Sequence, residues 1–214
     1  MTTSRRNFIA GTGAIIATLT HLQVRAADGA ESSVEKLLAG MAEELLADYP
    51  ENATVLGIDT GPRAQLKARL TDRSAEGQEA IARRVAARLV RLQAVDAAAL
   101  DEATRIDLDV VRTAHETAAE GFAFPYGDVA LLNQNWSWRN APYVVAQNTG
   151  AFLEIPSLLE EQHSINTRED ADAYLARLEA YAGQIDGETG RLQTAAAQRV
   201  IAPDFLLDKT LAQI

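Results

Sequence analysis

Residues 167–185 read TREDADAYLARLEAYAGQI, and this stretch predicts the fold class most directly. Thr167, followed three residues later by Asp170, resembles a capping box in which aspartate replaces the usual glutamate. After this start, apolar residues recur every three or four positions, as the buried face of a helix requires. We expect that inner face to consist of Ala171, Tyr174, Leu175, Leu178, Ala182 and Ile185.

The same periodicity recurs along most of the chain, and no strand-like alternation lasts more than a few residues. One segment, at about 121–150, breaks the pattern with glycines, prolines, amides and aromatics, and long loops of this kind are commonly functional. The sequence therefore predicts an all-α protein, an irregular multi-helix array with one long ordered loop. We expect helices over about 31–49, 63–70, 75–95, 100–119, 152–163, 184–200 and 203–214, besides the one that starts at 168.

Composition excludes several classes of function. The 214 residues include 20 Lys and Arg, 30 Asp and Glu and no Cys, which gives a net charge of −10. The absence of cysteine excludes a disulfide scaffold and any cysteine-based metal site or nucleophile. The acidic balance argues against binding to a nucleic-acid backbone, which needs a basic surface. No apolar run of about 18 residues predicts a membrane span.

The first 26 residues have the order of a bacterial export signal. Arg5 and Arg6 precede an apolar stretch that runs to Leu22, and small residues around Ala26 offer a cleavage site. The paired arginines resemble a twin-arginine signal. We therefore expect residues 1–26 to be a signal peptide, residues 27–214 to be the mature chain, and the protein to be periplasmic or secreted. The alternative is a short amphipathic N-terminal helix.

Two side-chain patterns suggest chemistry but have simpler interpretations. Four arginines lie on one side of the predicted helix 75–95, and in an acidic protein we expect a solvated face paired with carboxylates. His115-Glu116 begins like a helical zinc motif, but Ala119 stands where the second ligand is needed. We expect His115 and His163 to be surface or capping residues. The sequence thus predicts no catalytic residue and no metal ligand. The four arginines are Arg83, Arg84, Arg88 and Arg91.

The most unusual local sequence is NQNWSWRN, residues 133–140, which contains both tryptophans of the chain. Amides and indoles together can hold a peptide or a sugar through hydrogen bonds and stacking. The alternative is that the tryptophans anchor the long loop to the helices while the amides satisfy its backbone. If the segment binds a ligand, the binding residues are Asn133, Asn135, Trp136, Trp138, Arg139 and Tyr143.

Three stretches together resemble the N-terminal part of a bacterial family, the domain of unknown function 885. They are YPENATVLG at 49–57, LTDRSAEG at 70–77 and DADAYLARL at 170–178, the last followed by Ile185-Asp186. In the second stretch Ala75 replaces the proline usual in the family. The resemblance covers most of residues 31–214.

The resemblance implies a relationship to zinc metallopeptidases of the gluzincin type, which carry their zinc motif in a C-terminal half. No zinc ligand or catalytic glutamate of that motif can be carried over to a position in this sequence. The resemblance therefore implies zinc only in a full-length family member, and a chain that is inactive by itself and helps to shape a substrate cleft. The expected partners are the missing C-terminal catalytic half and a peptide, with no nucleic acid and no membrane after signal cleavage.

The C-terminal residues 204–214 read as an amphipathic helix without a glycine stop. We expect the chain to be incomplete there. Three alternatives stay open at this point. The chain is the non-catalytic portion of a metallopeptidase-like hydrolase, a free-standing periplasmic binding module that uses the Trp136/Trp138 loop, or a structural fragment with no activity.

Overall fold

The computed structural model describes residues 33–133 and 139–214, and every regular element in them is helical. Outside the helices, the described residues hold only two isolated β-bridges, Asp128–Ala141 and Ala146–Thr149. The predicted all-α class is therefore confirmed. The α-helices are α2 (Ser33–Asp48), α3 (Glu51–Val55), α4 (Ala75–Gln93), α5 (Glu102–Phe122), α6 (Ala151–Glu161), α7 (Arg168–Ala197) and α8 (Asp204–Leu211), with 3₁₀ helices η2 (Gly61–Ala68) and η3 (Ala97–Ala99).

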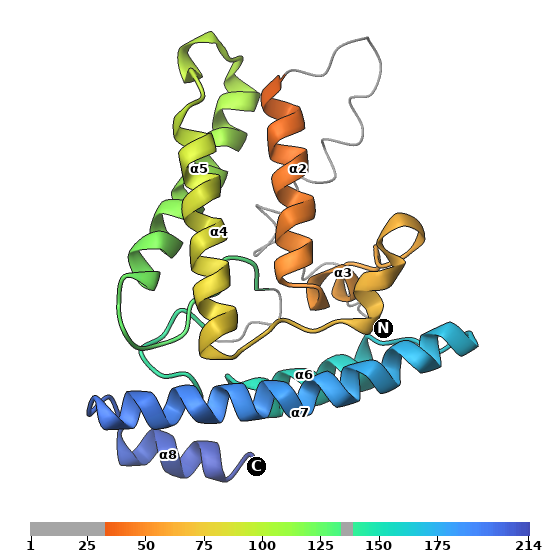
Figure 1. Ribbon diagram of the computed structural model, residues 1–214, viewed down its shortest axis with the longest axis vertical. Helices are drawn as coiled ribbons and strands as arrows, with labels where there is room; N and C mark the ends of the chain where they lie inside the picture. Colours follow the sequence, from red (N-terminus) through yellow and green to blue (C-terminus); the bar gives the residue numbers. More distant parts are fainter. Residues whose placement is uncertain (1–32, 134–138) are drawn as a thin grey trace, which may run out of the picture.

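The helices form an upright group that stands on a base (Figure 1). Helices α2, α4 and α5 run along one another, and α3 and η2 lie beside the foot of α2. Helices α6 and α7 lie side by side across the lower ends of the upright helices, and α8 follows beneath α7. The long segment 123–150 connects the two parts, since it leaves α5 and enters α6.

Local sequence signals set most helix starts. Ser74 caps α4 by accepting a hydrogen bond from the Gly77 backbone N–H at 3.0 Å. Thr167 and Asp170 form the predicted capping box at the start of α7, so that prediction is confirmed. Each cap satisfies backbone N–H groups that the first helical turn leaves without a partner.

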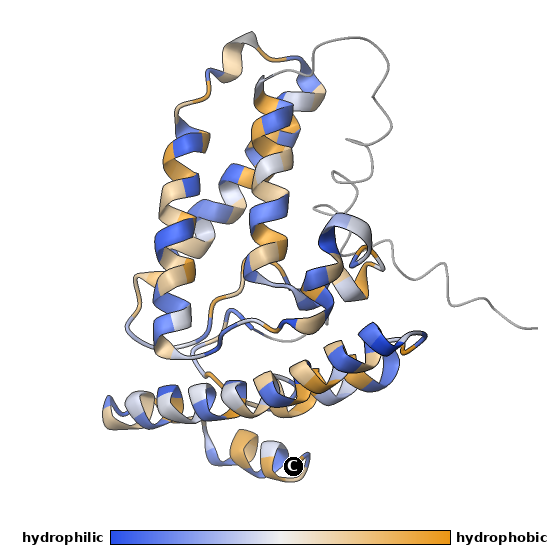
Figure 2. Ribbon diagram, turned by 45° about the vertical axis from the view of Figure 1, so that its right-hand side comes forward, coloured by the Kyte–Doolittle hydropathy of each residue, from blue (hydrophilic) through white to orange (hydrophobic). Residues whose placement is uncertain are grey.

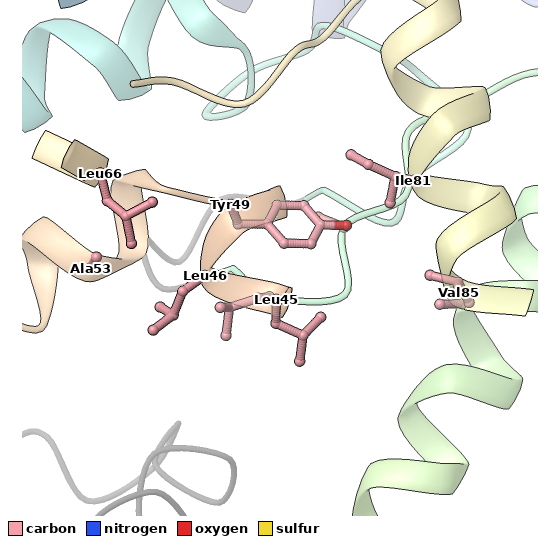
Figure 3. Packing of buried hydrophobic residues seen from close by; sticks show 10 residues of the cluster. Leu45, Leu46, Tyr49, Ala53, Leu66, Ile81 and Val85 are labelled. Atoms are coloured by element: carbon pink, nitrogen blue, oxygen red, sulfur yellow. The ribbon is translucent and has the colours of Figure 1, made fainter. Parts of the chain in front are cut away.

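The apolar core is divided among three clusters. The central one joins the lower end of α2 to α3, η2, α4 and α5 (Figure 3). There the Tyr49 ring is buried, and its hydroxyl accepts a hydrogen bond from the Leu131 backbone N–H at 3.1 Å. A second cluster, including Met41 and Leu108, fills the upper part of the upright group, and a third lies between α6 and α7.

Helix α7 does not bury the face that its apolar residues predict. Leu175, Leu178 and Ala182 are exposed, and only Tyr174 and Ile185 of the expected set pack against α6. The helix is a mixture of hydrophilic and weakly apolar residues along its length (Figure 2). Its inward side is instead largely polar. We call the four residues on this side the polar seam: Arg177, Gln184, Glu188 and Arg191.

The centre of the polar seam is an ion-pair cluster around Arg73, a buried residue just before α4. Its guanidinium donates to Glu188 at 2.8 Å and to Glu154 of α6 at 2.5 Å. The Glu188 carboxylate also accepts the Ala151 backbone N–H at 2.9 Å. One carboxylate thus neutralises a buried cation and caps the first turn of α6, where negative charge is favourable.

Two further predictions differ from the structure. Residues 168–197 form one continuous helix, whereas a second helix was expected from Gln184. Arg88 is buried and bonded to Glu44 and Asp48, so the arginine face of α4 pairs with carboxylates as predicted but is not wholly solvated. The described residues between 123 and 150 hold no helix, which agrees with the loop expected there.

A helix that crosses a membrane must be both long and apolar. Within residues 33–133 and 139–214, none of the helices combines the length and the apolar content needed to cross a membrane.

The ion-pair cluster leads to a stability prediction. Replacing Arg73→Met leaves Glu154 and Glu188 buried without their cation, so the free energy of unfolding should fall by about 3–5 kcal/mol. Urea denaturation followed by far-UV circular dichroism measures the change. The matched control is Arg83→Met, at an exposed pair with Glu79, where a change within about 0.5 kcal/mol is expected. Equal effects of the two substitutions would show that the cluster does not hold the base to the upright helices.

Candidate ligand-binding cleft

An open cleft of about 930 Å³ lies between α5 and the segment that follows it. One wall is the face of α5 that runs from Asp109 to Gly121. The other wall consists of residues between Phe124 and Leu131 together with Asn140, Ala141 and Pro142. The volume lies in the range of small-molecule and peptide side-chain sites.

Small residues on α5 make room for the cleft. Ala114, Thr117, Ala118 and Gly121 recur at helical spacing on the face that lines it. Their short side chains leave a space between α5 and the opposing segment, which larger side chains would fill. A Cβ at Gly121 would lie 3.0 Å from the Val129 side chain. At this end of the cleft, α5 and the opposing segment are therefore already in close contact.

The opposing wall is held in place by hydrogen bonds that cross the segment. Asp128 and Ala141 pair through both backbone groups, at 2.9 and 3.2 Å. The Asn140 side chain bonds to both backbone groups of Ala130, while its own backbone is left-handed with φ of 66°. Gly127 has φ of 89°, and a Cβ there would lie 2.7 Å from the Ala141 carbonyl oxygen, so only glycine fits.

Asp128 ties this wall to the polar seam. Its buried carboxylate pairs with Arg139 at 2.6 Å and with Arg191 of α7 at 2.8 Å. Burial by itself would raise the pKa of Asp128, but the two guanidinium groups outweigh burial and hold that pKa well below its usual range. Asp128 is therefore a permanently charged anchor and is not suited to donate a proton to a ligand in the cleft.

Two aromatic residues lie at the edge of the cleft, on the turn between α5 and the β-bridge that pairs Asp128 with Ala141. The rings of Phe124 and Tyr126 lie 5.7 Å apart between centroids, and the residues are 59% and 39% exposed. We call this pair the aromatic ridge. On its other side is a second hollow of about 320 Å³, lined by α4, α7 and the same turn.

The structure separates the binding residues that the sequence suggested. Asn135, Trp136 and Trp138 lie outside the described residues. Asn133 and Arg139 line a third cavity of about 20 Å³, which has room for about one water molecule. Tyr143 lies elsewhere, in a hollow of about 290 Å³ beside α7 and α8. The guanidinium of Arg139 is committed to Asp128.

Both described histidines are buried, whereas a surface or capping position was expected for them. His115 contacts the Val111 carbonyl through Nδ1 at 2.7 Å, one helical turn away. His163 accepts a hydrogen bond from Arg177 at Nδ1, and its Nε2–H donates to the Asp170 carbonyl at 3.0 Å. These partners require a neutral ring in His163, because a proton on Nδ1 would face the Arg177 guanidinium.

The described residues do not suit a zinc ion. Within residues 33–133 and 139–214, no group of three or more His, Asp or Glu side chains is arranged to hold a metal ion. The two carboxylates that line the cleft, Asp109 and Asp128, are both paired with arginines, at Arg112 for Asp109 and at Arg139 and Arg191 for Asp128.

Sequence reasoning missed the residues that form the cleft. The signals were present, since small residues recur on α5 and the run FAFPYG follows at 122–127. Neither signal indicates by itself that a helix and a turn enclose a hollow, because the hollow depends on where Asp128 is anchored.

Comparison with known proteins gives one match. A family model described as bacterial protein of unknown function (DUF885) matches residues 50–214. No curated protein and no solved structure matches the chain.

The two buried histidines predict how stability depends on pH. Desolvation lowers the pKa of each histidine and is the largest cause of the shift. The charged groups that face His115 are Arg88, Arg91 and Glu44. Those that face His163 are Arg177, Lys67 and Asp170. The folded pKa values lie below the unfolded value of about 6.5, so the unfolded chain binds protons first as the pH falls.

The free energy of unfolding should therefore be constant near pH 8 and decline below about pH 6.5, by at most about 1.4 kcal/mol per pH unit for each histidine. Urea denaturation at a series of pH values measures the slope. In the variant His115→Gln/His163→Gln the slope between pH 7 and 5.5 should shrink. An unchanged slope in that variant would assign the pH dependence to other groups.

Proposed function

The chain belongs to the DUF885 family over residues 50–214, and from this we propose that it is the non-catalytic, ligand-binding portion of a metallopeptidase-like hydrolase. The observation that carries the proposal is the cleft of about 930 Å³ between α5 and the segment 124–142. We propose that this cleft takes the apolar side chains of a peptide.

The character of the cleft supports binding rather than catalysis. Its α5 wall offers methyl and hydroxyl groups, and its edge offers the exposed rings of Phe124 and Tyr126. Burial of apolar surface supplies affinity at about 25 cal/mol per Å², and the few polar groups supply orientation. The one buried carboxylate in its wall, Asp128, is already neutralised by two arginines.

The catalytic part of the proposal rests on the resemblance to zinc metallopeptidases. In this proposal zinc and the catalytic glutamate belong to a separate C-terminal portion, which is the partner of the present helices. Exposed apolar residues on α8 support such a partner, since Phe205 and Leu211 are 63% and 69% exposed. The fold described here then shapes the substrate cleft.

The N-terminal sequence supports an exported location. We propose that Arg5 and Arg6 direct the chain to the twin-arginine route and that cleavage follows Ala26. The intact mass of the protein recovered from a periplasmic extract should correspond to a chain that begins at residue 27. Retention of residues 1–26 in that extract, or absence of the protein from it, would contradict export by this signal.

The alternative function is a free-standing periplasmic binding module that uses the Trp136/Trp138 loop. One observation favours it: Leu131 and Asn140, which flank that loop in sequence, both line the cleft. Binding to the chain without any hydrolase activity in the complete protein would support the module over the hydrolase.

Binding and metal content test the proposal on the full chain. N-phenyl-1-naphthylamine, a neutral aromatic probe, should bind saturably with increased fluorescence, and the chain should contain far less than one zinc per molecule. Thr117→Trp fills the cleft from an exposed position and should weaken probe binding at least about tenfold. Unsaturable binding would contradict the site, and about one tightly held zinc would contradict a non-catalytic role.

Glu120→Trp is the matched control. Glu120 is exposed on the same helix one turn further along and does not line the cleft. It adds the same indole to the protein without occupying the hollow, so probe affinity should stay within about twofold of the original. Both variants should unfold at the denaturant concentration of the parent chain.

A further inference from the structure

The outer side of α7 carries a surface that is separate from the cleft, which α5 and segment 124–142 enclose. We propose that an amphipathic helix with basic flanks, supplied by a partner protein, docks along this side of α7. The inference goes beyond the proposed function, because it concerns other residues and another class of ligand.

Apolar and small residues on this side of α7 follow one another at alternating spacings of four and three. They extend from position 171 to position 192, which is three heptads or about 32 Å along the helix axis. Alternating spacings of four and three form the seam by which one helix packs lengthwise against another. We call these residues the α7 stripe: Ala171, Leu175, Leu178, Ala182, Ile185, Thr189 and Leu192.

Much of the α7 stripe is uncovered. Leu175 is 62% exposed and Leu178 is 41% exposed. Ala182, Thr189 and Leu192 are exposed as well. Helix α8 lies beneath the C-terminal half of α7, whereas the N-terminal half, with Leu175 and Leu178, extends beyond it (Figure 1, Figure 2). Exposed leucines that repeat at helix-packing spacing indicate an interaction surface.

The two flanks of the α7 stripe differ. On one flank Tyr174 and Tyr181 pack against α6, as does Ile185 of the stripe, so α6 closes that side. The other flank carries three carboxylates at seven-residue spacing, each one position after a residue of the stripe. All three are exposed, and they are Asp172, Glu179 and Asp186.

The acidic flank selects the partner by charge, as flanking residues do in helix pairs. Lysines or arginines beside the apolar face of a docked helix would meet Glu179 and Asp186. Arg168 lies 3.8 Å from Asp172 in an exposed pair, which contributes little. A second copy of this chain would bring the same acidic flank, and like charges across an interface are unfavourable. An anionic membrane attracts basic faces, so it does not fit this flank either.

A basic model helix tests the surface on the full chain. The probe is fluorescein-labelled acetyl-LKKLLKLLKKLLKL-amide, and its charge-reversed counterpart is acetyl-LEELLELLEELLEL-amide. Fluorescence anisotropy should show saturable binding of the basic peptide and at least about tenfold weaker binding of the acidic one. The variant Leu175→Gln/Leu178→Gln removes the exposed leucines of the N-terminal half, so it should weaken binding of the basic peptide at least about tenfold.

Leu207→Gln/Leu211→Gln is the matched control for the leucine substitutions. Both leucines are exposed and lie on α8, so the variant makes the same chemical change on another helix. Its affinity for the basic peptide should stay within about twofold of the parent value. Both double variants should unfold at the denaturant concentration of the parent chain, because they replace exposed side chains.

Glu179→Gln/Asp186→Asn tests the charge of the flank. It should weaken binding of the basic peptide about fivefold at low ionic strength and make the affinity less dependent on salt. The matched control is Glu102→Gln/Glu120→Gln, which removes the same number of negative charges from exposed positions on α5. The control should keep the parent affinity within about twofold.

Four results would overturn the inference. Binding of neither peptide, or equal binding of both, would show that the α7 stripe does not select a basic helix. Full affinity in Leu175→Gln/Leu178→Gln, or a tenfold loss in the α8 control, would place the binding elsewhere. A parent chain that is dimeric by light scattering and becomes monomeric in Leu175→Gln/Leu178→Gln would show that a second copy covers the stripe. The full affinity in Glu179→Gln/Asp186→Asn would remove the argument from charge.

Discussion

A buried cation shared by two carboxylates sets the geometry of this molecule. Arg73 precedes α4, and its partners Glu154 and Glu188 belong to α6 and α7. Because an unpaired buried charge costs several kcal/mol, α7 must turn Glu188 inward. That rotation brings Arg191, one turn later, to Asp128 and so fixes the wall of the cleft. The wall of the cleft is thus positioned by an ion-pair cluster that does not line the cleft.

The same cluster explains which features the sequence could predict. The starts of α4 and α7 depend on contacts within three residues, at Ser74 and Thr167, and they follow from the sequence alone. The inward face of α7 depends on partners far away in the sequence, such as Arg73, which lies 115 positions from Glu188. Apolar periodicity therefore selected Leu175 and Leu178, which are exposed, while Arg177, Gln184 and Glu188 of the polar seam are buried. A rule that places apolar residues inside fails wherever buried charges find partners.

The candidate site was predictable in outline only. A functional loop at about 121–150 was expected, and its first part does line the cleft. The residues favoured there were amides and tryptophans, because their chemistry is visible in the sequence. The cleft instead uses small residues such as Ala114 and Gly121, whose value lies in the space they leave. Space is a property of how elements approach one another, and a single sequence does not encode it locally.

In this fold a buried carboxylate that is neutralised by arginines holds the structure together and is not available to exchange protons. Asp128 has two arginine partners that keep its pKa low, so it cannot exchange protons near neutral pH. The buried charge beside the cleft is thus neutralised within the fold, and the apolar cleft itself is the feature on which the proposed binding rests.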